Sequence, residues 1–261
     1  MRLTPRQWAI LGALSRNIRP VIHAGDRQAL ESAGMIRANE VTREGLAALS
    51  AKEAGAPEDR ALKILAKVRQ EIMGCTACVL SEGRTNVVPG EGHPRARIVF
   101  VGEAPGAEED RTGRPFVGRS GDLLTRMIQR MGLERDQVFI LNVCKCRPPG
   151  NRAPEITEVE ACRPFLERQL RAIEPEAIVA LGGSAYKVLH PTGGGGLGIT
   201  KARGSWFHVG THSPKGTHPR TFPVLPTYHP AYLLRNPQAR WEAWDDLRKV
   251  LRRLDLRVPK F

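Results

Sequence analysis

Short continuous runs of hydrophobic residues recur along most of this chain. Four of these runs have the length of buried β-strands and lie at residues 98–101, 138–141, 177–181 and 222–225. Apolar residues at helical spacing predict helices between and after them, over residues 122–131, 155–173, 184–189 and 240–254. Strands that alternate with helices form parallel sheets covered on both faces. We therefore expect an α/β fold, a central parallel sheet flanked by helices, over residues 61–261.

The first 55 residues show a different pattern, and we assign them to a small helical N-terminal extension. Helical spacing covers residues 5–14, 27–36 and 42–49. Residues 30–45 resemble the second half of a winged-helix DNA-binding domain, but a helix of such a domain is missing between Ser15 and Ala24. A plain helical extension and a degenerate winged helix therefore both stay open. A stretch with Gly and Pro at residues 51–59 is predicted to be a linker.

The formal net charge of the chain is +13, and most of the excess lies near its carboxyl end. Residues 201–261 contain twelve basic and four acidic residues, a net charge of +8. Such a balance favours a polyanionic partner, because neutralised phosphates release their counterions. No run approaches the ~20 apolar residues of a membrane span, and the first twenty residues lack the apolar block of a signal peptide. We expect a cytoplasmic, nucleoid-associated protein that binds no membrane.

The cysteines form a pattern typical of metal or cluster ligands. Cys75 and Cys78 make a Cys-x-x-Cys pair, and Cys146 and Cys162 follow further along the chain. Cys144 is the fifth, and an odd number without a secretory signal argues against a disulfide framework. Four thiolates suit either zinc or an iron-sulfur cluster, and spacing alone leaves both open.

Polar, motif-like turns follow three of the predicted strands. Gly102-Glu-Ala-Pro-Gly106 follows the first strand, Asn142 ends the second, and the segment from Thr227 to Arg235, with His229 in it, follows the fourth. Because open parallel sheets bind ligands at the carboxyl ends of their strands, we expect these turns to converge on one pocket.

In their order and spacing these motifs resemble the family 4, thermostable-type uracil-DNA glycosylases, which carry an iron-sulfur cluster. The likeness covers roughly residues 65–254 and includes Gly113-Arg-Pro-Phe-Val-Gly118 and Lys145-Cys-Arg-Pro-Pro-Gly-Asn151. It implies the uracil-DNA glycosylase fold and a monofunctional enzyme that flips uracil out of DNA. Hydrolysis of the N-glycosidic bond then leaves an abasic site and begins base excision repair. We expect a monomer that binds uracil-containing DNA.

The resemblance also implies the residues of the site. The 4Fe-4S cluster would be held by Cys75, Cys78, Cys146 and Cys162. The residues expected at uracil are Gly102, Glu103, Gly106, Phe116, Asn142 and His229. Phe116 would stack on the base, and the amide of Asn142 would match O4 and N3–H of uracil but not the opposite pattern of cytosine.

Two of these residues are the catalytic candidates. His229 would donate a hydrogen bond to O2, where negative charge develops as uracil leaves. Family 1 enzymes have Gly-Gln-Asp-Pro-Tyr at this first turn, so their water-activating aspartate corresponds to Ala104 here and their thymine-excluding tyrosine to Gly106. Glu103 is therefore our candidate for positioning or activating water.

The turn after His229 is expected to enter the DNA minor groove. Leu233 and Leu234 are the wedge candidates, Leu233 first because of its spacing from His229, and Arg235 would hold a phosphate.

Three alternatives remain at this point. A related glycosylase could accept a broader range of bases. Covalent relatives carry an inserted Lys-Arg-Arg-Ile-His loop, which is not found after Cys146. An iron-sulfur DNA-binding regulator would explain the cysteines and the N-terminal extension, but it would have no use for Phe116, Asn142 and His229 in these contexts.

Overall fold

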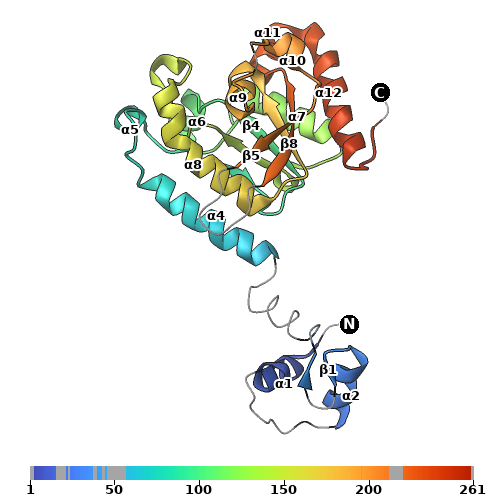
Figure 1. Ribbon diagram of the computed structural model, residues 1–261. Coiled ribbons are helices and arrows are strands. Elements are labelled where there is room, and N and C mark those ends of the chain that lie inside the picture. The colour runs from blue at the N-terminus through green and yellow to red at the C-terminus, as the bar shows by residue number, and fades with distance from the viewer. Residues whose placement is uncertain are drawn as a thin grey trace. The chain divides into compact units, whose positions relative to one another are not determined.

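The computed structural model describes residues 3–15, 22, 24–37, 40–42, 45, 57–194, 196–211 and 220–259. The chain divides into two compact units, residues 1–60 and residues 61–261. Figure 1 shows the course of the chain in both units.

The described residues of the first unit form two helices and a short antiparallel ribbon. Its elements are α1 (Pro5–Ser15), α2 (Ala24–Ser32), β1 (Ile36–Arg37) and β2 (Glu40–Val41). The first predicted helix is confirmed. The second was predicted to reach residue 36, but it ends at Ser32, because Gly34 takes a positive φ of 70° and Ile36 pairs with Val41. The predicted helix over residues 42–49 and the stretch from 16 to 23 lie mostly outside the described residues.

Six strands form one mixed sheet in the second unit. They are β3 (Glu91–Gly92), β4 (Ile98–Gly102), β5 (Phe139–Asn142), β6 (Ala177–Leu181), β7 (Phe207–Gly210) and β8 (Thr221–Thr227), in the spatial order β3-β5-β4-β6-β8-β7. The four predicted strands are confirmed and are parallel to one another. The two edge strands β3 and β7 are antiparallel and were not predicted, since β3 is two residues long and β7 is only partly buried.

The four predicted helices of this unit are also confirmed, as α7 (Arg119–Arg130), α8 (Ile156–Ile173), α9 (Gly182–Leu189) and α12 (Arg240–Arg253). The remaining helices are α4 (Pro57–Met73), α5 (Leu80–Gly83), α6 (Ala107–Thr112), α10 (Ile199–Ala202) and α11 (Pro230–Arg235). The end of the predicted linker is therefore helical, with Pro57 at the first position of α4, where its missing N–H costs nothing. Within the described residues, no helix has the length and apolar character needed to cross a membrane.

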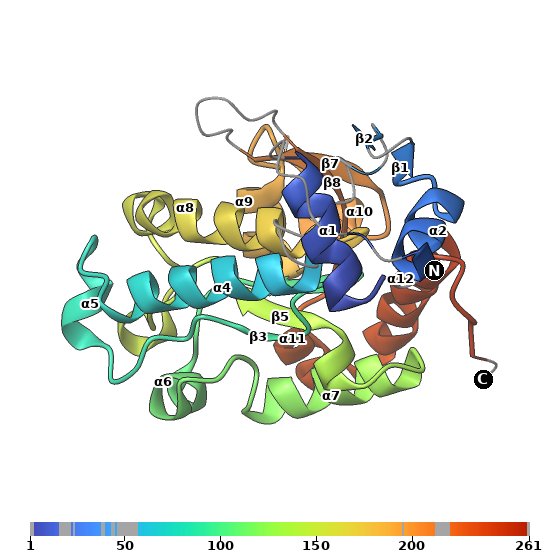
Figure 2. The same ribbon diagram turned by 90° about the horizontal axis from the view of Figure 1, so that it is seen from below.

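The sheet lies between two layers of helices, as Figure 2 shows. Val99 and Val101 of β4 pack on the side of α8 and α9. Ile98 and Phe100 of the same strand pack on the opposite side, against α7 and α12. Both faces of the central strands are thus buried, which explains why those strands are continuous hydrophobic runs in the sequence.

Candidate active site

The carboxyl ends of the central strands meet at an open pocket. Gly102, the last residue of β4, is in register with Asn142, the last residue of β5. Glu103, Phe116, Asn142 and His229 line the pocket together. Strands β5 and β6 lie on opposite sides of β4, so the order in which successive strands join the sheet reverses beside β4. Open α/β sheets bind ligands at such a switch point. The predicted convergence of the three motifs is present in the structure.

The carboxylate of Glu109 ties the turn after β4 to a second loop. Its Oε2 accepts a hydrogen bond from the N–H of Gly106 at 3.1 Å. Its Oε1 accepts from the N–H groups of Val117 at 3.0 Å and Gly118 at 3.2 Å. Glu109 stands three residues after Gly106 in the first turn of α6, the usual place for a carboxylate that caps a helix start. The N–H of Gly106 is therefore already hydrogen-bonded within the protein.

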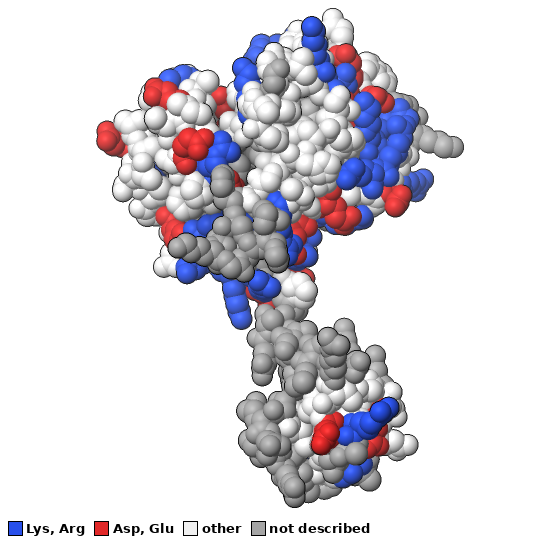
Figure 3. All heavy atoms as spheres, in the orientation of Figure 1, with Lys and Arg blue, Asp and Glu red and all other residues white. Residues whose placement is uncertain are grey.

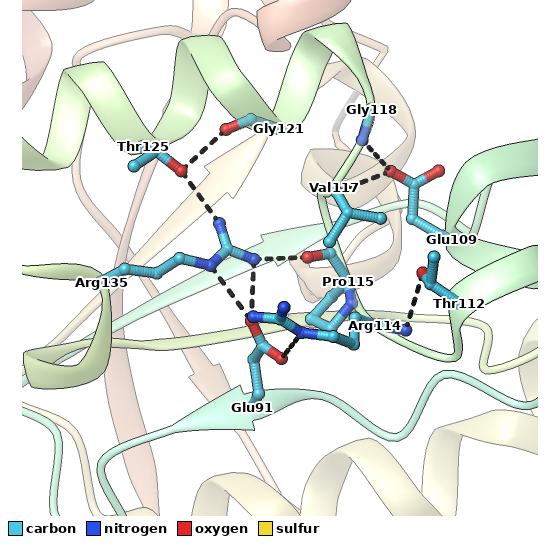
Figure 4. Close-up of polar contacts among 10 residues, drawn as sticks. All are labelled: Glu91, Glu109, Thr112, Arg114, Pro115, Val117, Gly118, Gly121, Thr125 and Arg135. Atoms are coloured by element: carbon cyan, nitrogen blue, oxygen red, sulfur yellow. Dashed lines mark hydrogen bonds and ion pairs between the residues drawn. The ribbon is translucent and has the colours of Figure 1, made fainter.

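A network of charged side chains supports the loop that carries Phe116, as Figure 4 shows. Arg135 donates to the carbonyl oxygen of Pro115 and, from Nε, to Oε1 of Glu91 at 3.1 Å. Phe116 has a φ of 51°, which is rare for a bulky residue. Its backbone lies so close to Gly121 that a Cβ there would stand 1.9 Å from the Phe116 carbonyl oxygen. Such a conformation costs about 1–3 kcal/mol and persists only where its surroundings impose it.

Phe116 and Asn142 both lie against Gly102. A Cβ on Gly102 would stand 2.3 Å from Oδ1 of Asn142 and 2.5 Å from Cζ of Phe116. Asn142 is 2% exposed, and its Oδ1 has no hydrogen-bond partner among the described residues. The same holds for Oε1 of Glu103. Because buried polar atoms are nearly always hydrogen-bonded, these two oxygens indicate a site for a ligand that brings donors.

His229 is positioned as a neutral imidazole. The backbone N–H of Ala231 donates to Nδ1 at 3.1 Å, so the proton of the neutral ring is on Nε2. The pKa of His229 is lowered to about 4, chiefly by burial and also by the positive charge of Arg235, and Glu109 opposes the shift. Gly182, after β6, permits the close packing of this residue, since a Cβ there would lie 2.9 Å from Cβ of His229.

Helix α11 carries the predicted DNA-contacting residues, which differ in how far they are exposed. Leu233 is 1% exposed and packs in a hydrophobic cluster between α7, α11 and α12. This burial argues against Leu233 as the wedge, because withdrawing a leucine from a packed cluster would leave a cavity. Leu234 is half-buried, and Arg235 is exposed at the rim of the pocket. Tyr232, which was not predicted, is 38% exposed.

The four predicted cluster ligands line a second, much smaller cavity. Cys75 and Cys78 follow α4, Cys146 follows β5, and Cys162 lies on α8. Cys144 does not line this cavity, because it is buried in the hydrophobic layer under α8 and hydrogen-bonded to Cys162. In the described part of the chain, no group of three or more His, Cys, Asp or Glu side chains is arranged to hold a metal ion.

Two cations also line the cysteine cavity. Lys145 is 1% exposed, and none of the described carboxylates forms an ion pair with it. Its Nζ donates to the carbonyl oxygen of Asn142 at 2.7 Å, and burial lowers the pKa of this ammonium to about 8. Arg84 donates from Nη1 to Sγ of Cys146 at 3.1 Å. Because an unpaired buried cation is costly, the charges of this cavity fit an anionic group bound by thiolates.

The comparison with known families agrees with this arrangement. The family model described as the uracil DNA glycosylase superfamily matches residues 89–248, and the chain therefore belongs to that superfamily. Within it, the chain is similar to proteins named type-4 uracil-DNA glycosylase. It is 50% identical to the one from Sulfurisphaera tokodaii over 188 residues, which cover 71% of this chain and 83% of the relative. The relative from Thermotoga maritima is 49% identical over a match that covers 65% of this chain and 82% of the relative. The relative from Archaeoglobus fulgidus is 43% identical over a match that covers 72% of this chain and 92% of the relative. The predicted family resemblance and fold class are confirmed.

Three features of the site were given no role from the sequence. Glu109 had a local signal, its position three residues after Gly106 at a helix start. Lys145 lies inside a motif whose cysteine drew attention while its lysine did not. The pair of Glu91 and Arg135 had no such signal, because the two residues are 44 positions apart.

Proposed function

We propose that this protein is a uracil-DNA glycosylase, which hydrolyses the N-glycosidic bond of uracil in DNA and leaves an abasic site. One observation carries the proposal. A single pocket contains an aromatic ring, a buried amide oxygen without a partner in the described chain, and a neutral imidazole that can donate from Nε2. Membership of the superfamily and 43–50% identity to the relatives named above support the same conclusion.

The pocket residues would recognise uracil through its face and its polar edge. An enzyme that acts on a base within a duplex must extrude the base and hold it in a pocket. The ring of Phe116 offers the stacking surface. Oδ1 of Asn142 would accept from N3–H of uracil, and the amide nitrogen of the same side chain would donate to O4. Cytosine presents the opposite pattern on this edge, so Asn142 would discriminate between the two bases.

His229 would stabilise the leaving group. Cleavage of the glycosidic bond puts negative charge on uracil, and Nε2–H of His229 would donate to O2. A neutral donor suffices for this role, in agreement with the lowered pKa of the ring. Glu103 would position or activate the attacking water, because its buried Oε1 lacks a partner in the described chain and lies at the same pocket.

DNA beside the flipped nucleotide would contact α11. Arg235 at the pocket rim remains the candidate for a phosphate contact. Leu234 remains a wedge candidate, and the exposed ring of Tyr232 joins it in place of the buried Leu233.

The cysteine cavity would hold a 4Fe-4S cluster through Cys75, Cys78, Cys146 and Cys162. The soft thiolate donors and the two cations beside them, Lys145 and Arg84, suit a negatively charged cluster. When bound, such a cluster would join α4, the segment after β5 and α8. Its role would be structural, because hydrolysis of a glycosidic bond transfers no electrons.

The activity is tested directly with a labelled oligonucleotide that contains one uracil. After incubation with the protein, alkali should cleave the strand at the uracil position, and an otherwise identical strand with cytosine should stay intact. Uracil-containing DNA that remains resistant to alkali, although the purified protein is folded, would refute the proposed function.

A further inference from the structure

A second groove lies on the other side of helix α11 from the uracil pocket. Ala231 and Arg235 of α11 line the pocket that holds His229. Leu233, from the same short helix, lines the separate groove, which has a volume of about 590 Å³. One helix therefore forms a wall of both, and the groove lies beside the pocket.

The groove combines an apolar floor with a basic rim. Side chains such as Leu233 and Trp244 form the floor, and three arginines stand around it, Arg126 and Arg130 from α7 and Arg240 from the start of α12. None of the described residues that line the groove is acidic. A concave site with three guanidinium groups and no carboxylate fits a phosphate-bearing ligand, because arginine binds phosphate through paired N–H donors.

Two of these arginines are held in place by the floor. The guanidinium of Arg130 lies 5.0 Å from the ring centroid of Trp244. Arg240 donates from Nε to the carbonyl oxygen of Leu233 at 3.3 Å. An arginine that is already held by such contacts has less conformational freedom to lose when it binds a ligand, so the entropic cost of binding is smaller. Arg126, by contrast, is exposed on the middle of α7.

The positive charge continues from the uracil pocket into the groove. Arg119, at the start of α7, lines the pocket, and Arg126 and Arg130 follow it by seven and eleven residues. These spacings correspond to about two and three helical turns, so the three side chains share one face of α7. The helix thus presents a row of arginines that leads from one cavity to the other.

The neighbouring helix α12 extends the basic surface. It carries Arg240, Arg248, Lys249, Arg252 and Arg253, and Figure 3 shows basic side chains gathered over the side of the molecule where α12 lies. A polyanion at the groove would therefore meet further positive charge beyond it.

We propose that the groove between α7 and α12 binds the phosphate backbone of the substrate strand beside the nucleotide whose base enters the pocket. This proposal rests on the proposed function, which supplies the strand. The guanidinium groups of Arg126, Arg130 and Arg240 contact phosphate oxygens, and the apolar floor packs against the sugar. These contacts fix the register of the strand without reading its sequence.

The test measures binding apart from excision. The probe is DNA with one 2′-fluoro-2′-deoxyuridine, whose glycosidic bond resists hydrolysis, and Kd is measured between 50 and 200 mM salt. Arg126→Gln should weaken binding by roughly three- to tenfold and lower the slope of log K against log salt by about one. Arg126→Lys should recover part of the affinity. Arg69→Gln on α4 removes the same charge from an exposed position outside the groove and should leave both quantities unchanged.

Neutral methylphosphonate links then locate the contact. Each phosphate next to the uracil analogue is replaced in turn. Wild-type protein should lose affinity at one or two positions on one side of the base. Arg126→Gln should lose less than wild type at the phosphate that Arg126 contacts, because that contact is already gone.

If Arg126→Gln and Arg240→Gln both bind the DNA with the same Kd and the same salt slope as the wild-type protein, the proposal is overturned. The proposal is also overturned if these variants bind DNA normally but no longer bind an acidic peptide that the wild-type protein binds, since that result assigns the groove to a protein partner. Failure of the proposed function has a different signature, because ordinary uracil-containing DNA would then bind and stay intact.

Discussion

The rings of Phe116 and His229 lie 5.7 Å apart between centroids and are tilted by 35° to each other. The two residues are more than one hundred positions apart in the chain and come from different loops, one after α6 and the other after β8. In the proposed function, this proximity would let one flat base use both, with its face on Phe116 and its edge toward Nε2 of His229.

Loss of His229 should slow the chemical step at every pH at which the protein is folded. His229→Ala removes a donor aimed at developing oxyanion charge, and such losses amount to roughly a hundredfold or more in rate. Because the folded-state pKa is about 4, the ring is neutral between pH 5 and 8, and the ratio of wild-type to variant rates should be constant over that range. Single-turnover rates at saturating enzyme measure this ratio. A ratio that falls as pH rises through 6.5 would show that the charged imidazolium acts instead.

Asn142→Asp should exchange base selectivity. The substitution replaces an amide donor by an acceptor, so the hydrogen bond to O4 of uracil is lost and the amino group of cytosine gains an acceptor. Loss of one buried hydrogen bond of this kind predicts a decrease of roughly ten- to a hundredfold in uracil excision. Parallel assays with uracil and cytosine in the same sequence measure both effects. If Asn142→Asp retains full uracil excision, Asn142 does not recognise the base.

Gly102→Ala should block the pocket while leaving most of the fold intact. The added methyl group would stand 2.3 Å from Oδ1 of Asn142 and 2.5 Å from Phe116, so both side chains must move. Excision should fall at least as far as in Asn142→Asp. Gly210→Ala is the matched control, because Gly210 also ends a strand and a Cβ there meets nothing within 4 Å. Equal activity of the two variants would contradict this account of Gly102.

Variants at Cys144 and Cys146 should differ in their iron content. Purified protein should contain about four irons per chain and absorb visible light, because four thiolates line one cavity. Cys146→Ser should lose iron. Cys144→Ser should keep it, since Cys144 lies in the hydrophobic layer and not at the cavity. A colourless protein that contains zinc would contradict the cluster.

Deletion of residues 1–55 tests which of the two interpretations of the N-terminal extension holds, a plain helical extension or a degenerate winged helix that binds DNA. If it binds DNA, the shortened protein should have a weaker affinity for DNA and a smaller salt slope, and uracil excision should remain measurable. An unchanged salt titration would leave this unit without a role in DNA binding.

The sequence by itself determined the central strands, the main helices and the family. Each of these depends on a local signal, either the period of hydrophobic positions or a motif of a few adjacent residues such as the turn from Gly102 to Gly106. Strands β4, β5, β6 and β8 are continuous apolar runs because both faces of the sheet are covered. The edge strands β3 and β7 lack that burial, and so they gave no such signal.

Only the tertiary structure decided which side chains face a cavity. Leu233 follows His229 at the spacing expected of a wedge, but contacts from α7 and α12 bury it. Cys144 and Cys146 are two residues apart, but β5 ends at Asn142, and the chain beyond it directs one cysteine into the hydrophobic layer and the other to the cavity. The physical reason is the same in both cases. Burial depends on residues distant in the chain, and those neighbours are fixed only when the helices pack on the sheet.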